Sequence, residues 1–116
     1  HCKDMALAYQ VSDIVISPSI EPEAFGRVAV ETQSMEKLII ASNIGGSNET
    51  IINEKTGLLF ESGDPNSLKK KIIQALTMDE TSLKLMGKEG RKNVIKKFNV
   101  EKMCFSTYSE YKRLLN

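Results

Sequence analysis

Three short apolar runs alternate with segments of helical periodicity in this chain, and this alternation constrains the fold more than any other feature. The runs cover residues 14–17, 38–41 and 58–60. Continuously apolar, β-branched runs of this length are typical of strands buried in a parallel sheet. The pattern predicts an α/β fold: a partial doubly wound parallel sheet of about three strands, half of a Rossmann-like domain, followed by C-terminal helices.

Six helices are predicted around these strands. An amphipathic helix covers residues 3–11, and a second helix begins after Gly26. Ser47 or Asn48 is expected to cap a short third helix that continues through Ile52.

The second half of the chain is predicted to be mainly helical. Asp64, followed by proline, is a strong N-cap for the fourth helix. A long helix over 80–98 contains Gly87 and Gly90, which weaken it unless another backbone packs closely there. Asn99 can cap the last helix. The predicted buried side of that helix is formed by Met103, Tyr108, Tyr111 and Leu115.

Length and charge limit the classes of function. A chain of 116 residues is long enough for one domain with its own core. Its 16 basic and 15 acidic residues nearly cancel and neither sign is segregated, so nucleic acid is not an expected partner. No apolar run approaches the roughly 18 residues that a membrane span needs. We therefore expect a cytoplasmic protein. Because the chain begins at His1 within a helical pattern, we also expect it to be part of a larger one.

Cysteine and histidine are too sparse for a metal site. Cys2 and Cys104 lie near opposite ends, and His1 is the sole histidine. These residues cannot assemble the usual ligand set, so neither a metal nor another cofactor is expected. A disulfide between the cysteines and two reduced thiols both stay open, and we prefer the reduced thiols.

Lysines are concentrated in residues 69–71 and 88–97. They form either a solvated helix face or a peripheral contact with an anionic membrane surface. We favour the solvated face because acidic residues are interleaved with the lysines.

Residues 18–35 have the pattern of a strand end, an acidic loop, a glycine and a helix. Glu23 and Glu31 flank this turn with seven residues between them. Amide N–H groups around Gly26 to Val28 would be free to bind an anion, because the first turn of a helix leaves them unpaired. A carboxylate can also accept hydrogen bonds from vicinal hydroxyl groups of a sugar. The stretch therefore predicts a site for a phosphorylated, hydroxyl-rich ligand.

Each of these residues also has a plain structural interpretation. Two acids at this spacing arise by chance in a chain with many acids, and such pairs are usually solvated. Arg27 could bind phosphate, but an arginine in a first helical turn is more often solvated; its unfavourable position in the helix dipole suggests an anionic neighbour.

The stretch at 18–35 resembles the donor-site signature of retaining nucleotide-sugar glycosyltransferases with two Rossmann-like domains, the GT-B architecture. This family is called glycosyltransferase family 4, or glycosyl transferases group 1, and its E-x7-E motif matches Glu23 and Glu31. The resemblance continues through residues 40–51 and 56–65 and into the last helix. It implies that residues 1–116 form the second half of a C-terminal, donor-binding domain.

The resemblance also implies roles for individual residues. Glu31 would bind the ribose hydroxyls of the nucleotide, and Glu23 would contact the transferred sugar as the catalytic carboxylate. The backbone at Phe25, Gly26, Arg27 and Val28 would meet the sugar and the diphosphate. The implied reaction transfers a hexose with retention, usually without a metal, to a sugar or lipid-linked sugar acceptor in cell-surface polysaccharide or lipopolysaccharide synthesis.

Two departures from the family pattern have consequences. Met35-Glu36-Lys37-Leu38 stands where the family has M-G-x-P, so the turn at Glu36 is strained unless Glu36 extends the helix. The basic residues that hold the diphosphate in the family precede His1. We therefore expect the isolated chain to be inactive in transfer and to self-associate through uncovered surfaces. The alternative is a non-catalytic module that binds a nucleotide sugar or associates with another chain.

Overall fold

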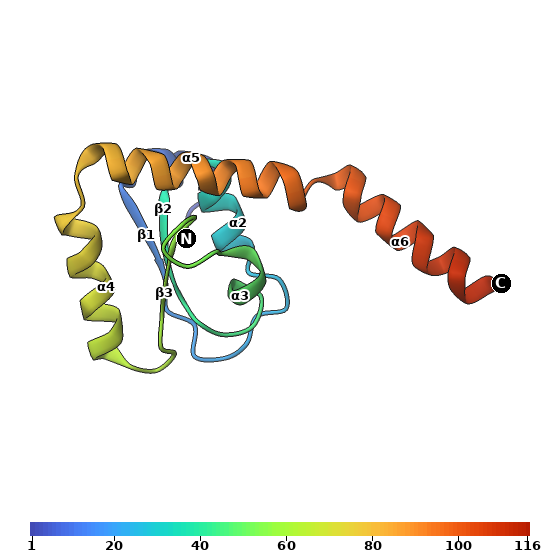
Figure 1. The fold of residues 1–116 in the computed structure, drawn as a ribbon, viewed down its shortest axis with the longest axis horizontal. Coiled ribbons are helices and arrows are strands. Elements are labelled where there is room, and N and C mark those ends of the chain that lie inside the picture. The colour runs from blue at the N-terminus through green and yellow to red at the C-terminus, as the bar shows by residue number, and fades with distance from the viewer.

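A parallel three-stranded sheet is packed between helices in the computed structural model, which describes residues 1–116 (Figure 1). The strands β1 (Ile14–Ser17), β2 (Leu38–Ser42) and β3 (Leu58–Phe60) lie in the order β1-β2-β3. Both pairings are parallel, and β2 is the central strand. The predicted α/β fold with a partial parallel sheet is confirmed.

Six helices surround or follow the sheet, as predicted. Their bounds are α1 (Met5–Val11), α2 (Arg27–Ser34), α3 (Ser47–Thr50), α4 (Pro65–Thr77), α5 (Glu80–Lys97) and α6 (Val100–Leu115).

Alternate residues of β2 supply the cores on the two faces of the sheet. Leu38 and Ile40 belong to a cluster with residues of β3, α4 and α5, whereas Ile39 and Ala41 pack with Ala29 of α2 and with Ile51. Every residue of β2 is buried. This explains why the sequence of the central strand is continuously apolar: each face of β2 is covered by helices.

The prediction that β1 is a buried strand is wrong in part. β1 is only half-buried, and the Ile16 side chain is 41% exposed. β1 pairs with β2 along one edge and has no neighbour along the other. The helix that contacts β1 most is α2. Among the strands, α4 packs on β3 and α5 on β2, so these two helices do not cover all of β1.

The helix caps were partly predicted. The Asp64 side chain accepts hydrogen bonds from the amides of Asn66 and Ser67, and Asn99 accepts one from the amide of Lys102. Both N-cap predictions are confirmed. The prediction for α3 is wrong: its N-cap is Gly46, it has no side-chain cap, and it ends at Thr50.

Close packing explains the two glycines inside α5. A Cβ at Gly87 would collide with the carbonyl oxygen of Glu36, and one at Gly90 would lie 3.0 Å from the Gln33 side chain. α5 lies directly against α2, and the glycines allow this approach. The expectation that another backbone packs here is met at Gly87.

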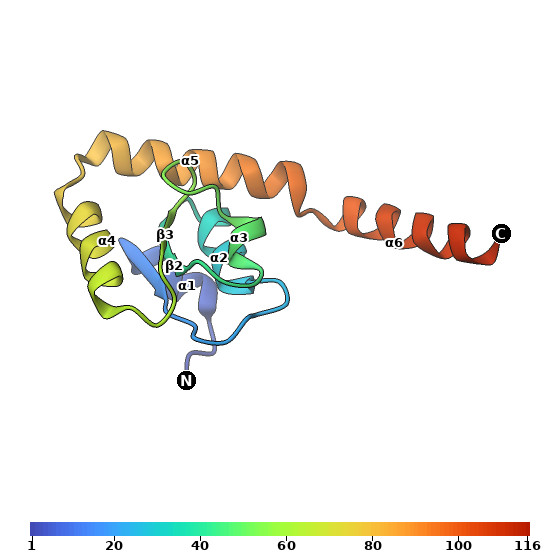
Figure 2. The ribbon, with the colours of Figure 1, turned by 60° about the horizontal axis from the view of Figure 1, so that its bottom comes forward.

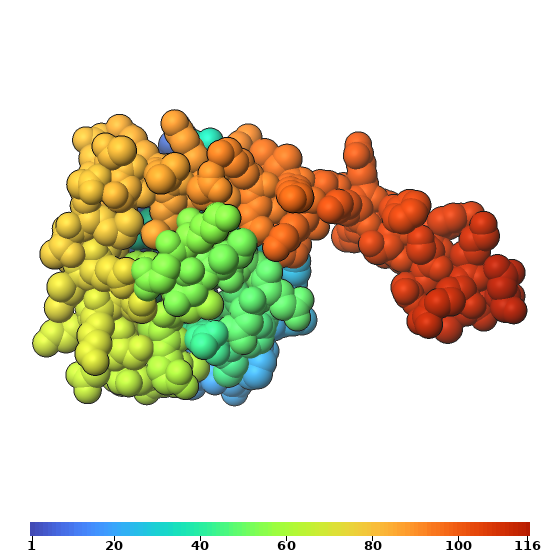
Figure 3. Space-filling model, viewed as in Figure 1, coloured from blue at the N-terminus to red at the C-terminus, as the bar shows by residue number.

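α6 extends away from the rest of the molecule, as the two ribbon views and the space-filling view show (Figures 1, 2 and 3). None of its residues is buried. The predicted burial of Met103, Tyr108, Tyr111 and Leu115 is therefore wrong, since each is more than 60% exposed. The amphipathic sequence of α6 predicts that its apolar side packs against another surface. No other part of the chain covers that side. No helix has the length and apolar character to cross a membrane.

Candidate functional site

The loop between β1 and α2 ends in a helix N-terminus with free amides. Gly26 is the N-cap of α2 and has φ of 78°, in the left-handed region that favours glycine. No side chain caps this helix, and the amides of Gly26, Arg27 and Val28 donate no hydrogen bond within the chain. These three N–H groups can therefore bind an anion at the positive end of the α2 dipole.

A second loop, between β2 and α3, holds the first one in place. The amide of Gly46 donates a 2.8 Å hydrogen bond to the carbonyl oxygen of Glu23. A Cβ at Gly46 would collide with the backbone of Phe25, so only glycine allows this contact. The sequence prediction treated residues 43–46 as a turn and missed this supporting role. The adjacent pair Gly45-Gly46 was the available signal for close backbone packing.

Glu31 is the predicted site residue with the most contacts. Its side chain is 35% exposed and accepts hydrogen bonds on both oxygens. The hydroxyl of Tyr9 in α1 donates to Oε2 at 2.8 Å, and the guanidinium of Arg27 donates to Oε1 at 3.0 Å. The anionic neighbour expected for Arg27 is thus Glu31. Sequence reasoning missed Tyr9, because no local pattern links residues 22 positions apart.

Burial and Glu31 together perturb Tyr9. Its side chain is 4% exposed. Burial, followed by the hydrogen bond to the Glu31 carboxylate and the negative charge of that carboxylate, raises the pKa of Tyr9 to about 12, although Arg27 opposes this shift. Tyr9 therefore stays protonated and remains a hydrogen-bond donor at neutral pH.

Glu23 lies in the exposed part of the loop. Its carboxylate accepts a 2.7 Å hydrogen bond from the Ser19 hydroxyl. This contact limits the freedom of the carboxylate and leaves its second oxygen open to solvent. Glu23 and Glu31 share no hydrogen-bond partner: Ser19 donates to Glu23, and Tyr9 and Arg27 donate to Glu31.

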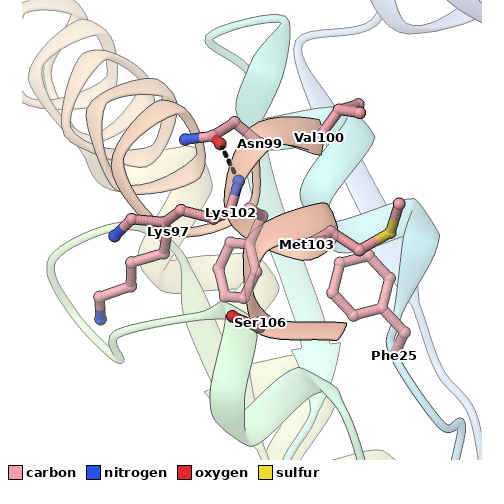
Figure 4. Close-up of a pocket in the computed structure, with 8 residues that line it drawn as sticks. Phe25, Lys97, Asn99, Val100, Lys102, Met103 and Ser106 are labelled. Atoms are coloured by element: carbon pink, nitrogen blue, oxygen red, sulfur yellow. Dashed lines mark hydrogen bonds between the residues drawn. The ribbon is translucent and has the colours of Figure 1, made fainter. Parts of the chain in front are cut away.

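Phe25 points toward the junction of α5 and α6. Its ring meets that of Phe98 edge to face, with centroids 5.6 Å apart. Both rings line a cavity of about 450 Å³ that also includes Met103 and Lys102 from α6 (Figure 4). Glu31 and Arg27 instead line a separate cavity of about 230 Å³ between α1 and α2. The structure thus brings Arg27 and Glu31 together and directs the Phe25 side chain elsewhere.

The chain offers no obvious metal centre. No group of three or more histidine, cysteine, aspartate or glutamate side chains is placed to hold a metal ion. Cys2 and Cys104 are both free and exposed.

Comparison with known proteins decides the family. The model of the family described as "Glycosyl transferases group 1" matches residues 2–93, which is most of the chain. This range includes the loop between β1 and α2 and the loop between β2 and α3. The chain belongs to this family. The family predicted from the resemblance is confirmed.

Individual relatives and solved structures are similar over nearly the whole chain. The capsular polysaccharide biosynthesis glycosyltransferase CapM of Staphylococcus aureus is 31% identical over 99% of this chain, which corresponds to 30% of CapM. A glycosyltransferase structure from Rickettsia africae ESF-5 has a TM-score of 0.92 and 39% identity, covering 100% of this chain and 31% of that one. Sucrose-phosphate synthase from Thermosynechococcus elongatus has a TM-score of 0.84 and 34% identity, covering 96% of this chain and 27% of its own. The chain thus spans about a third of the length of these relatives.

Proposed function

We propose that this chain forms part of the nucleotide-sugar site of a group 1 glycosyltransferase that transfers a hexose from the donor to an acceptor. The observation that carries the proposal is the start of α2. Three amide N–H groups have no partner there, and a carboxylate lies on either side of them in the sequence. Membership of the glycosyl transferases group 1 family supports the same reaction class.

Each group at the start of α2 has a chemical role in this proposal. The amides of Gly26, Arg27 and Val28 bind the diphosphate and the adjoining sugar, and they stabilise the negative charge that develops on the leaving diphosphate. Glu31 accepts hydrogen bonds from the ribose hydroxyls. Glu23 contacts the hydroxyls of the transferred sugar, with Ser19 restricting its carboxylate.

The remaining features of the proposal come from the family resemblance. They are retention of anomeric configuration and transfer without a metal or other cofactor. A cytoplasmic location is proposed from the sequence instead, with a peripheral membrane contact of the lysine-rich residues 69–71 and 88–97 as the alternative to a solvated helix face. The similarity to CapM favours an acceptor in cell-surface polysaccharide synthesis.

Two further proposals concern the 116-residue chain by itself. We expect it to bind nucleotide without transferring sugar, because it corresponds to only about a third of its relatives. We also expect it to self-associate through α6 and the free edge of β1. Detection of sugar transfer by the purified chain would contradict the first expectation.

Nucleotide titration tests the role of Glu31. We expect UDP, GDP or ADP to bind, as followed by amide chemical shifts, and we expect Glu31→Ala to raise the Kd about tenfold or more, because a hydrogen bond to a charged group is lost. Glu80→Ala is the matched control: it removes an exposed carboxylate that is also part of an (i, i+4) ion pair on a helix. Equal affinity of the wild type and Glu31→Ala would exclude the proposed donor site.

A further inference from the structure

The hydrogen bond from Tyr9 to Glu31 joins two helices at the candidate site. It is 2.8 Å long, and it is the contact that attaches the Glu31 side chain to α1. A buried hydroxyl that loses its partner is destabilising, so Tyr9 keeps this bond wherever α1 packs against α2. Glu31 therefore has one carboxylate oxygen in a fixed position before any ligand binds.

The two partners of Glu31 differ in how easily they can leave. The Arg27 side chain is 83% exposed, and an exposed ion pair contributes little to stability. Arg27 can thus exchange Glu31 for a ligand phosphate at small cost. Tyr9 is 4% exposed, uncharged and held between helices, so it stays in place.

The Glu31 carboxylate retains the capacity to bind a diol. An ionised carboxylate offers about four lone-pair positions on two oxygens. Tyr9 occupies one position on Oε2 and Arg27 one on Oε1. One position on each oxygen is left, which matches two adjacent hydroxyl groups. The cavity of about 230 Å³ beside Glu31 gives a ligand access from the side of α1 and α2.

We propose that Tyr9 is the positioning residue of this site: its hydroxyl holds Oε2 of Glu31 so that the remaining lone pairs of the carboxylate face the ribose 2′- and 3′-hydroxyls of the bound nucleotide. This inference rests on the function proposed above. Tyr9 also lines the cavity beside Glu31, and its hydroxyl acts on the ligand through the carboxylate to which it donates. The pKa of Tyr9, raised to about 12 by burial and by the Glu31 carboxylate, agrees with a hydroxyl that donates to an anionic partner.

The Kd values of ribonucleotides and 2′-deoxyribonucleotides show whether Tyr9 positions the Glu31 carboxylate or only packs between neighbouring residues. The probes are UDP, GDP and ADP, each paired with its 2′-deoxy analogue, and the readout is the Kd from amide chemical shifts of the 116-residue chain. We expect the wild type to bind at least one ribonucleotide about tenfold more tightly than its deoxy analogue. Tyr9→Phe should lose most of this preference while binding the deoxy analogue as the wild type does. A purely structural role of Tyr9 would weaken both ligands equally.

Two controls complete the experiment. Tyr108→Phe removes the same hydroxyl from an exposed position on α6 and should leave the preference unchanged. Glu31→Ala should abolish the preference. If the wild type binds no nucleotide or shows no preference, or if Glu31→Ala keeps it, the proposed function fails and this inference with it. If those two proteins behave as expected and Tyr9→Phe keeps the preference, the positioning role alone is overturned.

Stability at alkaline pH tests the burial of Tyr9 and its bond to Glu31 together, without a ligand. The charged groups beside Tyr9 are Glu31 and Arg27 of α2. Because the folded chain holds the pKa of Tyr9 at about 12 and the unfolded chain at 10.0, the stabilisation is fully present below pH 10 and is lost as the pH rises to about 12. Wild-type stability should therefore fall more steeply over this range than that of Tyr9→Phe. Parallel curves for the two proteins would contradict the buried placement of Tyr9 beside the Glu31 carboxylate.

Discussion

Glu36 adopts a backbone conformation that is unfavourable for its side chain. Its φ is 58°, in the left-handed region, where a residue with a Cβ is less stable than glycine by about 1–2 kcal/mol. Glu36 lies between α2 and β2 and does not extend the helix. Of the two alternatives considered for this position, strain in the turn is the one observed. It occurs where the family pattern has glycine.

Replacing Glu36 should relieve this strain. We expect Glu36→Gly to raise the free energy of unfolding by about 1 kcal/mol, as measured by chemical denaturation. The variant also loses an ion pair to Arg91, but this pair is half exposed and 3.8 Å long, so the loss is small. Glu36→Ala is the matched control, since it removes the same carboxylate and keeps the Cβ. Equal free energies of unfolding for Glu36→Gly and Glu36→Ala would show that the backbone at this position is not strained.

α5 and α2 form the closest helix pair of the molecule because of glycine at the contact. Gly87 faces the backbone of Glu36, and Gly90 faces the side chain of Gln33. A buried polar network reinforces this contact: the Gln33 and Asn93 amides both donate to the carbonyl oxygen of Thr50. The network joins α2 and α5 to Thr50 at the C-terminal end of α3, and so holds the short helix that follows the second loop of the site.

Alanine at position 87 of α5 should make the chain less stable than glycine does, although alanine is the better helix former. Alanine is about 1 kcal/mol more favourable than glycine within a helix. We nevertheless expect Gly87→Ala to lower the free energy of unfolding by about 1–3 kcal/mol, because overpacking against a backbone atom forces the helices apart.

Gly90→Ala provides the comparison for this prediction. A Cβ at this position would lie 3.0 Å from the Gln33 side chain and 3.3 Å from the Thr56 carbonyl oxygen, both longer than the contact at Gly87, so the loss should be smaller. Thermal unfolding of the two variants under identical conditions measures the difference. A Gly87→Ala protein as stable as the wild type would show that α2 and α5 do not pack this closely.

The whole molecule combines a packed sheet domain with a projecting helix. α6 carries large exposed apolar side chains along its length, including Met103, Tyr108, Tyr111 and Leu115. β1 also leaves one edge unpaired. Apolar surface and a free strand edge both favour association between chains.

Light scattering tests this association. We expect the purified chain to form dimers or larger oligomers, and Tyr111→Glu on the apolar side of α6 to shift it toward monomer, because a charge would be buried at the contact. Ser109→Glu is the control, since it introduces the same carboxylate on the opposite side of the helix. A monomeric wild-type chain at high concentration would refute the prediction.

Local interactions explain which features could be predicted from the sequence. The strands at residues 14–17, 38–41 and 58–60 and the caps Asp64 and Asn99 depend on neighbouring residues, and the structure has them where they were expected. The loop that ends at Gly26 was also predicted, because a strand end, a glycine and a helix start follow one another directly. The sequence by itself therefore determined the fold class and the family, and it predicted the loop and helix start at which the site is proposed.

Contacts between distant residues were decided only by the tertiary structure. The bond of Tyr9 to Glu31 spans 22 positions, and the packing of Gly46 against Phe25 requires both loops to meet at one edge of the sheet. The exposure of α6 likewise depends on which surfaces surround it, not on its own amphipathic pattern. Sequence periodicity indicates which side of a helix is apolar, but the folded chain alone determines whether anything lies against that side.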